Sequence, residues 1–221
     1  MKNKVNWLEA ALLLAPFVVI AAFWNKLPGR VPVHWNLRGE VDRWASSKPI
    51  EIFGLPLIAV ALVALLHVLP RLDPKLRGML QESGRMRAAL QIMRLSLAAF
   101  FGALFSIQIA TALGYTLASG RAMIWCTLVL LAIMGNYLGN LRPNYFVGIR
   151  TPWTLESAAT WRATHRLGGR LMFFGALLLL AAEFFLSQRA FGFLFVTLVL
   201  LLVAWAFLYS WHHFRTHGAT R

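Results

Sequence analysis

The sequence has few cysteines and few acidic residues. Its one cysteine, Cys126, excludes an intrachain disulfide and any metal site built from several thiolates. Only eight residues are aspartate or glutamate, so acid–base chemistry would have to draw on these and on six histidines. A G-x-S-x-G elbow, an H-E-x-x-H helix, a Walker A loop and a dinucleotide fingerprint are all missing. We therefore predict neither an enzyme nor a cofactor.

Apolar residues, by contrast, are abundant. They make up 59% of the 221 residues and charged residues only 14%, whereas soluble chains average about half and about one quarter. A helix needs about 20 apolar residues to cross the roughly 30 Å hydrocarbon layer of a membrane. Six runs approach or reach that length, at 7–24, 50–69, 95–117, 122–138, 171–186 and 191–211. The sequence therefore predicts an all-α polytopic membrane protein with six transmembrane helices.

These runs divide a single membrane domain, 1–221, into parts. The expected parts are a first helix pair at 1–70 with an external loop at 25–49, a cytoplasmic linker at 71–94, a four-helix part at 95–211 with a cytoplasmic loop at 139–170, and a cytoplasmic tail at 212–221. Tight turns expected at 118–121 and 187–190 would pair neighbouring spans antiparallel. The first run lacks a clear cleavage site after its apolar stretch, so we expect it to be retained rather than removed as a signal peptide.

The net charge of +14 is distributed unevenly among the loops. In a soluble protein it would suggest nucleic-acid binding, but here the positions of the charges explain it better. Seven of the 22 basic residues fall on one side of the predicted topology: Lys26, Arg30, Arg38, Arg43, Lys48, Arg121 and Arg189. The other fifteen fall on the side of the two termini. The positive-inside rule therefore predicts cytoplasmic termini, with membrane lipids rather than nucleic acid as partners.

The first external loop is expected to be structured. Its prolines and glycines exclude a long helix, although 31–35 can extend briefly, and its tryptophans suit the membrane interface. His34, Glu40 and Asp42 offer ligand types that suit zinc or manganese, but their spacing matches no closed ligand pattern. We therefore predict no metal site, and expect Asp42 to accept backbone hydrogen bonds or to pair with Arg38 or Arg43.

Two helix starts are predicted in the cytoplasmic loops. Asp73 can cap a short helix with Pro74 in its first position. In the second loop either Thr151 caps a helix that begins at Pro152, or Thr154 does so with Glu156 in its first turn.

We expect the helix of the second loop to run to about residue 167 on the inner leaflet. Gly168 and Gly169 would then let the chain turn into the fifth span. Arg162, Arg166 and Arg170 repeat every four residues and should form one basic stripe along this helix.

Three polar side chains fall inside the predicted spans: Glu183, Gln108 and Asn136. A carboxylate in hydrocarbon is costly and is a candidate for function, so Glu183 either pairs or reaches toward the interface near Arg189, or binds a proton or ligand. Gln108 and Asn136 either form hydrogen bonds between helices or line a path through the protein.

Two long polar stretches resemble one known family. The stretch LPGRVPVHWNLRGEVDRWASSK resembles the N-terminal loop of the SdpI family of bacterial immunity membrane proteins, with its pattern P-x-H-x-N-x-x-G-x-x-D and a following lysine. The stretch NYFVGIRTPWTLESAATWRATHRLGGR resembles the second signature of that family. The matching external residues are Pro32, His34, Asn36, Gly39, Asp42 and Lys48. The matching cytoplasmic residues are Asn144, Gly148, Arg150, Thr151, Pro152, Trp153, Thr154, Trp161, His165, Arg166 and Gly169.

The resemblance implies an integral protein of a bacterial inner membrane that protects the cell against a secreted, membrane-active toxin peptide. For some members it also implies a link to a cytoplasmic transcriptional regulator. In this interpretation Trp35 and Trp44 would add aromatic anchors to the external loop. Two alternatives stay open. One is a small proton-coupled transporter that uses Glu183, Gln108 and Asn136. The other is an interfacial enzyme on a lipid-linked substrate, with His165 as base and Arg150 and Arg166 on a phosphate.

Overall fold

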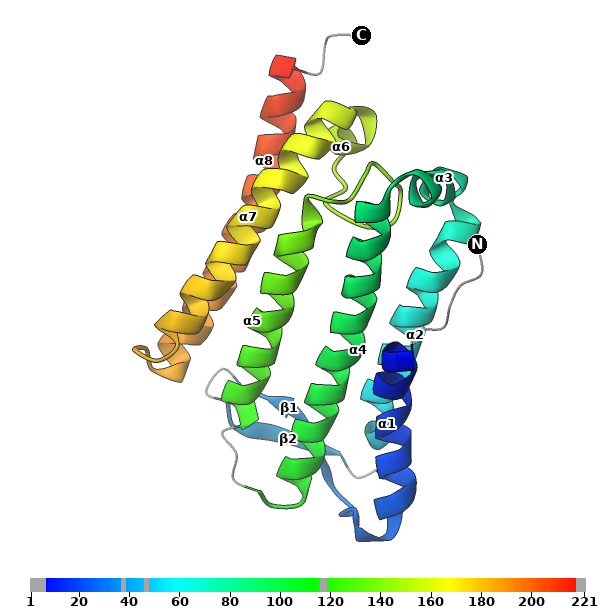
Figure 1. Cartoon of the computed structure of the whole chain (residues 1–221). Helices are drawn as coiled ribbons and strands as arrows, with labels where there is room; N and C mark the ends of the chain where they lie inside the picture. Colours follow the sequence, from blue (N-terminus) through cyan, green and yellow to red (C-terminus); the bar gives the residue numbers. More distant parts are fainter. Residues whose placement is uncertain (1–6, 37–38, 46–47, 116–118, 218–221) are drawn as a thin grey trace. The chain divides into compact units, whose positions relative to one another are not determined.

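Helices form most of the structure, a computed structural model that describes residues 7–36, 39–45, 48–115 and 119–217 (Figure 1). The helices are α1 (Trp7–Phe23), α2 (Lys48–Leu72), α3 (Pro74–Glu82), α4 (Gly84–Ala112), α5 (Ser119–Leu138), α6 (Pro152–Glu156), α7 (Ala158–Ala182) and α8 (Gln188–His217). A 3-10 turn, Trp24–Lys26, follows α1, and the strands β1 (Val31–Trp35) and β2 (Val41–Ala45) form one antiparallel hairpin.

Six helices of the described chain are long and apolar enough to cross a membrane. They are α1 with the following 3-10 turn, α2, α4, α5, α7 and α8, with mean hydropathies between 1.2 and 2.7. Each overlaps one of the six apolar runs of the sequence, although α4 ends at Ala112 and α7 at Ala182, before the ends of the runs 95–117 and 171–186. The prediction of an all-α polytopic membrane protein is confirmed, and the protein is a multi-pass membrane protein.

Several helices are longer than their apolar runs. The third transmembrane helix, α4, begins at Gly84 rather than at residue 95. Most of the expected linker at 71–94 therefore belongs to α3 and to the first turns of α4. α8 continues through His217, so most of the expected tail is helical. Hydropathy marks the part of a helix suited to lipid, whereas the backbone hydrogen bonds continue into water. Of the predicted turn at 118–121, residue 118 lies outside the described residues and the others belong to α5.

The chain forms two compact units, each with its own core. Unit 1 comprises Met1–Leu65 and Arg94–Leu130, and unit 2 comprises Leu66–Met93 and Leu131–Arg221. The core of unit 1 contains Ile20, Leu27, Val31, Ile52, Phe105 and Ile109. Val31 is a strand residue, so the hairpin and the helices of unit 1 share one core.

A buried ion pair also holds unit 1 together. The Nε–H of Arg94 on α4 donates to Oε2 of Glu9 on α1 at 3.1 Å, and both side chains are largely shielded from solvent. Breaking such a pair leaves a buried charge without compensation, so it fixes the relation between the two helices.

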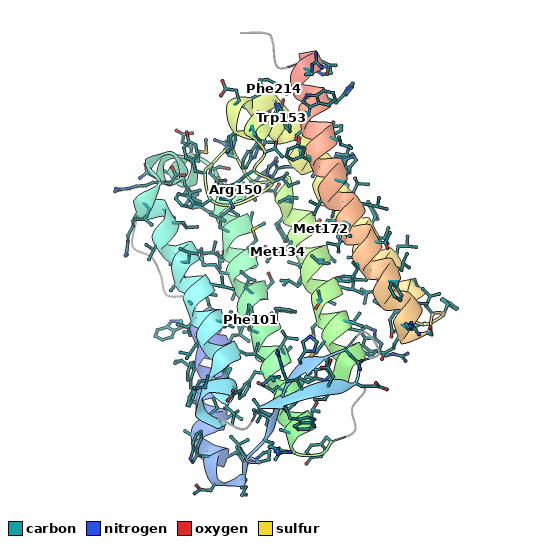
Figure 2. All side chains as sticks on the ribbon, turned by 180° about the vertical axis from the view of Figure 1, so that it is seen from behind. Phe101, Met134, Arg150, Trp153, Met172 and Phe214 are labelled. Atoms are coloured by element: carbon teal, nitrogen blue, oxygen red, sulfur yellow. The ribbon has the colours of Figure 1, made fainter. Side chains whose placement is uncertain are left out.

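The core of unit 2 is centred on Trp161 of α7. Its buried members are Leu69, Leu76, Met86, Ala89, Leu90, Met93, Leu138, Leu141 and Trp161. Met134 of α5 and Met172 of α7, both labelled in Figure 2, pack against this cluster. The core therefore joins the α3–α4 segment to the long connector that follows α5.

The prediction that Gly168 and Gly169 form a turn is wrong. α6 ends after five residues, Ser157 caps the next helix, and α7 runs without interruption through both glycines. These glycines instead allow close packing. A Cβ atom on Gly169 would lie 2.5 Å from the carbonyl oxygen of Gly135 on α5, and one on Gly168 would lie 2.9 Å from the side chain of Ile149. The expected long interfacial helix is thus reduced to α6.

Candidate functional site

The first candidate site is the hairpin at 31–45. Its register pairs Val31 with Ala45 and Trp35 with Val41, with irregularities on either side of His34. Asn36 closes the turn, because its backbone N–H donates to the Glu40 carbonyl at 2.9 Å and its side-chain oxygen accepts from the Glu40 N–H at 3.2 Å. Gly39 has a φ of +74°, a left-handed conformation that suits glycine. The prediction of a structured loop is confirmed in the described residues.

An exposed pair marks one face of this hairpin. The Nδ1–H of His34 on β1 donates to Oδ1 of Asp42 on β2 at 2.6 Å, with side chains 54% and 41% exposed. Asp42 thus pairs across the hairpin with His34, and within the described residues it forms no ion pair with Arg43. Arg38, its other predicted partner, lies outside the described residues. The carboxylate of Glu40 accepts a hydrogen bond from the side-chain amide of Asn36. No group of three metal-binding side chains gathers within the described ranges.

The opposite face of the hairpin is attached to the helices of unit 1. The indole N–H of Trp35 donates to the hydroxyl of Ser119 on α5 at 2.9 Å, and the amide of Gln108 on α4 donates to the Pro32 carbonyl at 3.0 Å. A Cβ atom on Gly120 would lie 2.1 Å from the Cα of Gly39, so backbone touches backbone there. Gln108 thus anchors the hairpin, and Pro32 and Trp35 are anchors rather than exposed contacts.

An apolar groove of about 470 Å³ runs between α1 and α4 in the same unit. It is lined by residues such as Leu12, Pro16, Phe105, Leu113 and Tyr115. Among the described residues of the hairpin, the exposed side chains are those of His34, Glu40, Asp42, Arg43 and Trp44. The side chain of Lys48, another predicted contact, lies outside the described residues. Unit 1 therefore offers a polar, aromatic hairpin face and an apolar groove.

The second candidate site is the connector between α5 and α6, which Asn144 organises. Its side-chain oxygen accepts from the backbone N–H groups of Phe146 (2.9 Å) and Val147 (2.7 Å). Its amide donates to the carbonyls of Arg142 (2.9 Å) and Val147 (3.0 Å). All four hydrogen bonds are local, so this buried asparagine specifies an irregular loop.

Thr151 and Thr154 form the predicted helix start. Thr151 caps α6 and Thr154 completes a capping box, with the two backbone-to-hydroxyl bonds at 2.9 and 3.2 Å. The Thr151 hydroxyl also donates to Ser210 of α8 at 2.9 Å. The alternative of Thr154 as the cap is wrong. Pro152 occupies the first helical position, and the ring of Trp153, which is labelled in Figure 2, packs edge-on against Phe207 of α8.

Trp161 and His165 of α7 pack against the connector at Gly148. The rings of Trp161 and His165 are stacked at 3.9 Å, and the indole N–H of Trp161 donates to the Leu141 carbonyl at 2.8 Å. His165 Nδ1–H donates to the Trp161 carbonyl at 2.9 Å, while Nε2 accepts from the N–H of Ile149 at 2.9 Å. Gly148, with a φ of +123°, leaves room for the ring.

This geometry assigns His165 a structural role. Nδ1 faces a carbonyl and Nε2 faces an N–H, so the ring is held as the neutral Nδ1–H tautomer. Both nitrogens are occupied by backbone, and neither is available to a substrate. The geometry gives no support to His165 as the base of an enzyme.

The remaining predicted residues are dispersed. Arg150 is exposed and donates to the Tyr145 carbonyl at 2.9 Å, and Arg166 is exposed on α7. Glu183 is buried at the C-terminal cap of α7, whereas Asn136 is exposed on α5. None of Glu183, Gln108 and Asn136 lines the α1–α4 groove.

Asp73 caps α3 as predicted, and it also binds the connector, which the sequence did not indicate. One carboxylate oxygen accepts from the N–H of Leu76 at 3.1 Å, and the other from the N–H of Tyr145 in the connector at 3.4 Å. Ser119 and Ser210 were also missed, because a serine partner 59 or 84 residues away carries no local signal. Asp73 therefore joins α3 to the connector.

Comparisons with known proteins match the two regions of the sequence that contain the connector and the hairpin. The sequence profile of the SdpI/YfhL protein family matches residues 140–210, which contain the connector, and that of a domain of unknown function, DUF1648, matches residues 11–60, which contain the hairpin. The chain is 24% identical over 220 residues to Immunity protein SdpI of Bacillus subtilis strain 168, covering 99% of this chain and all of that protein. No solved structure matches the chain.

Proposed function

Because this chain belongs to the SdpI family and is an SdpI-like immunity protein, we propose that it protects its cell against a secreted, membrane-active toxin peptide. In this proposal unit 1 binds the toxin, and the protein acts by binding rather than by catalysis. The interfacial enzyme and the proton-coupled transporter have weaker support. Both ring nitrogens of His165 are bonded to backbone groups, and the side chain of Asn136 is exposed.

The observation that carries the proposal is the exposed hairpin face. Fixed by its contacts with Ser119, Gln108 and Gly120, the hairpin holds His34 and Asp42 as a preformed pair, and the exposed Trp44 follows Asp42 by two residues, on the same face of β2. A rigid aromatic ring beside charged groups is typical of residues that dominate protein–peptide affinity. The apolar groove between α1 and α4 in the same unit suits the apolar side of a peptide that enters membranes.

Removal of the pair tests this surface. In a strain that lacks this protein, screened against peptides encoded beside its gene, we expect the wild-type chain to restore survival and His34→Ala or Asp42→Ala to reduce it at least about tenfold, as for a binding hot spot. Survival at matched membrane levels is the measurement. Glu82→Ala, which breaks an exposed ion pair of unit 2 at 3.4 Å, is the matched control. Full protection by both hairpin variants would remove the hairpin from the mechanism.

We also propose that the hairpin faces the cell exterior and that the connector and both termini are cytoplasmic. The support is the excess of basic residues on the side of the termini.

The single cysteine makes this orientation simple to test. In a Cys126→Ser background, Arg43→Cys on the hairpin should react with a membrane-impermeant maleimide in intact cells. Residue 43 is exposed, and the proposed topology places it outside the cell, where the reagent can reach it. Tyr145→Cys, exposed in the connector, should react only after the membrane is permeabilised. Labelling of Tyr145→Cys in intact cells would invert the proposed topology.

A further inference from the structure

A second groove, in unit 2, has no role in the proposed toxin binding. It has a volume of about 410 Å³ and lies between α7 and α8, which pack side by side in Figure 1. Its lining includes Arg162, Arg166 and Arg170 of α7 and Tyr209, His213 and His217 of α8. One wall is therefore the arginine stripe of α7, and the other is a row of rings on α8.

The arginines of this groove have no acidic partner within the described part of the chain. None of Arg162, Arg166 and Arg170 is ion-paired or hydrogen-bonded there. At 1.5 Å per residue, the three positions span roughly 12 Å along the helix. Three adjacent guanidinium groups repel one another, and each can donate two parallel hydrogen bonds to a phosphate. The wall thus favours an anion with more than one phosphate.

The opposite wall is rigid. Tyr209 stacks on Trp205 at 5.0 Å, and His217 stacks on His213 at 4.6 Å. His213 also bonds through Nδ1 to the hydroxyl of Thr160 on α7 at 3.2 Å, which fixes the two helices to each other. The groove is therefore a built feature of the α7–α8 pair rather than a gap between mobile side chains.

The same row of α7 becomes apolar at one end of the groove. Continuing the four-residue spacing of Arg162, Arg166 and Arg170 leads to Phe174 and Leu178, which are 64% and 66% exposed. From residue 171 to residue 182, α7 carries no charged side chain. A bound molecule could therefore place phosphates on the arginines and hydrocarbon along the following turns, an arrangement that only an amphiphile fits.

From this arrangement we propose that the α7–α8 groove binds the headgroup of an anionic phospholipid with two phosphodiesters, of the cardiolipin type. Basic pockets between transmembrane helices are known to accept such headgroups. The charge of the arginine wall exceeds that of one phosphodiester, and its length accommodates two. The lipid chains lie against Phe174 and Leu178.

Lipid titration of the full-length protein in detergent, followed by native mass spectrometry, tests the proposal. We expect cardiolipin to bind more tightly than phosphatidylglycerol at equal phosphate concentration. Arg162→Gln, Arg166→Gln and Arg170→Gln together should weaken cardiolipin binding at least about tenfold, since each basic group near the surface contributes to attraction. Arg166→Gln alone should give a smaller loss in the same direction, which covers the case of a triple variant that does not fold.

The matched control removes the same charge elsewhere. Arg71→Gln, Arg77→Gln and Arg85→Gln together alter three exposed arginines of α2, α3 and α4 that do not line the groove. This variant should bind cardiolipin like the wild type. Equal losses in the two triple variants, or unchanged binding by the groove variants, would overturn the proposal. Displacement of cardiolipin by inorganic phosphate would show a site for a free anion, and equal binding of phosphatidylglycerol would rule out recognition of two phosphates.

Discussion

Replacement of Trp161 by alanine should lower the free energy of unfolding by about 3–5 kcal/mol, the range for a buried tryptophan cut to alanine. The side chain is fully buried at the centre of the core of unit 2. The variant loses the stacking on His165, and it leaves the Leu141 carbonyl without its indole donor. Thermal unfolding of the purified protein in detergent measures the loss.

Trp125→Ala is the matched control for that experiment. Trp125 lies on α5 and is 38% exposed, so its truncation removes less buried surface than that of the fully buried Trp161. We expect a smaller fall in the unfolding temperature. A Trp161→Ala protein that unfolds at the temperature of the Trp125→Ala protein would show that the connector does not depend on this ring.

The second large effect is expected at Gly169. A methyl group there would lie 2.5 Å from the Gly135 carbonyl oxygen, an atom of backbone that cannot move without separating α5 from α7. Overpacking of this kind costs about 1–3 kcal/mol, and more where the backbone must shift. Gly169→Ala should therefore unfold at a lower temperature than the wild type, measured by the same thermal unfolding.

Gly175 provides the control on the same helix. No atom lies within 4 Å of a Cβ built there, so Gly175→Ala adds only the helix propensity of alanine, worth up to about 1 kcal/mol. That variant should be as stable as the wild type or more stable. If Gly169→Ala is also stabilised, the two helices do not approach as closely as the structure indicates.

The sequence was sufficient to predict the membrane architecture. Hydrocarbon imposes a minimum length on each apolar run, and this one rule locates all six spans. The helix starts at Pro74 and Pro152 were also predictable, because a cap and a proline act within four residues. The family resemblance of the connector is likewise confirmed by the comparisons.

The roles of the glycines and of His165 could not be predicted in the same way. Two adjacent glycines are also typical of a turn. Only the tertiary structure reveals that Gly169 permits contact with α5, and Gly168 contact with Ile149 and with Trp205 of α8. His165 follows Trp161 by four residues, which places the two side chains on one face of a helix, but its two backbone partners come from the connector and from its own helix. Such pairings depend on tertiary structure, which local spacing does not encode.

The hairpin of unit 1 is the part whose construction bears most on recognition. A free loop of that length would lose conformational entropy on forming a complex, and this loss would be subtracted from the affinity. Contact of Gly39 with Gly120 and the hydrogen bond from Trp35 to Ser119 impose that order during folding instead. The surface is preorganised, so association with a partner requires little rearrangement of the receptor, and discrimination between partners rests on the side chains that the rigid loop displays.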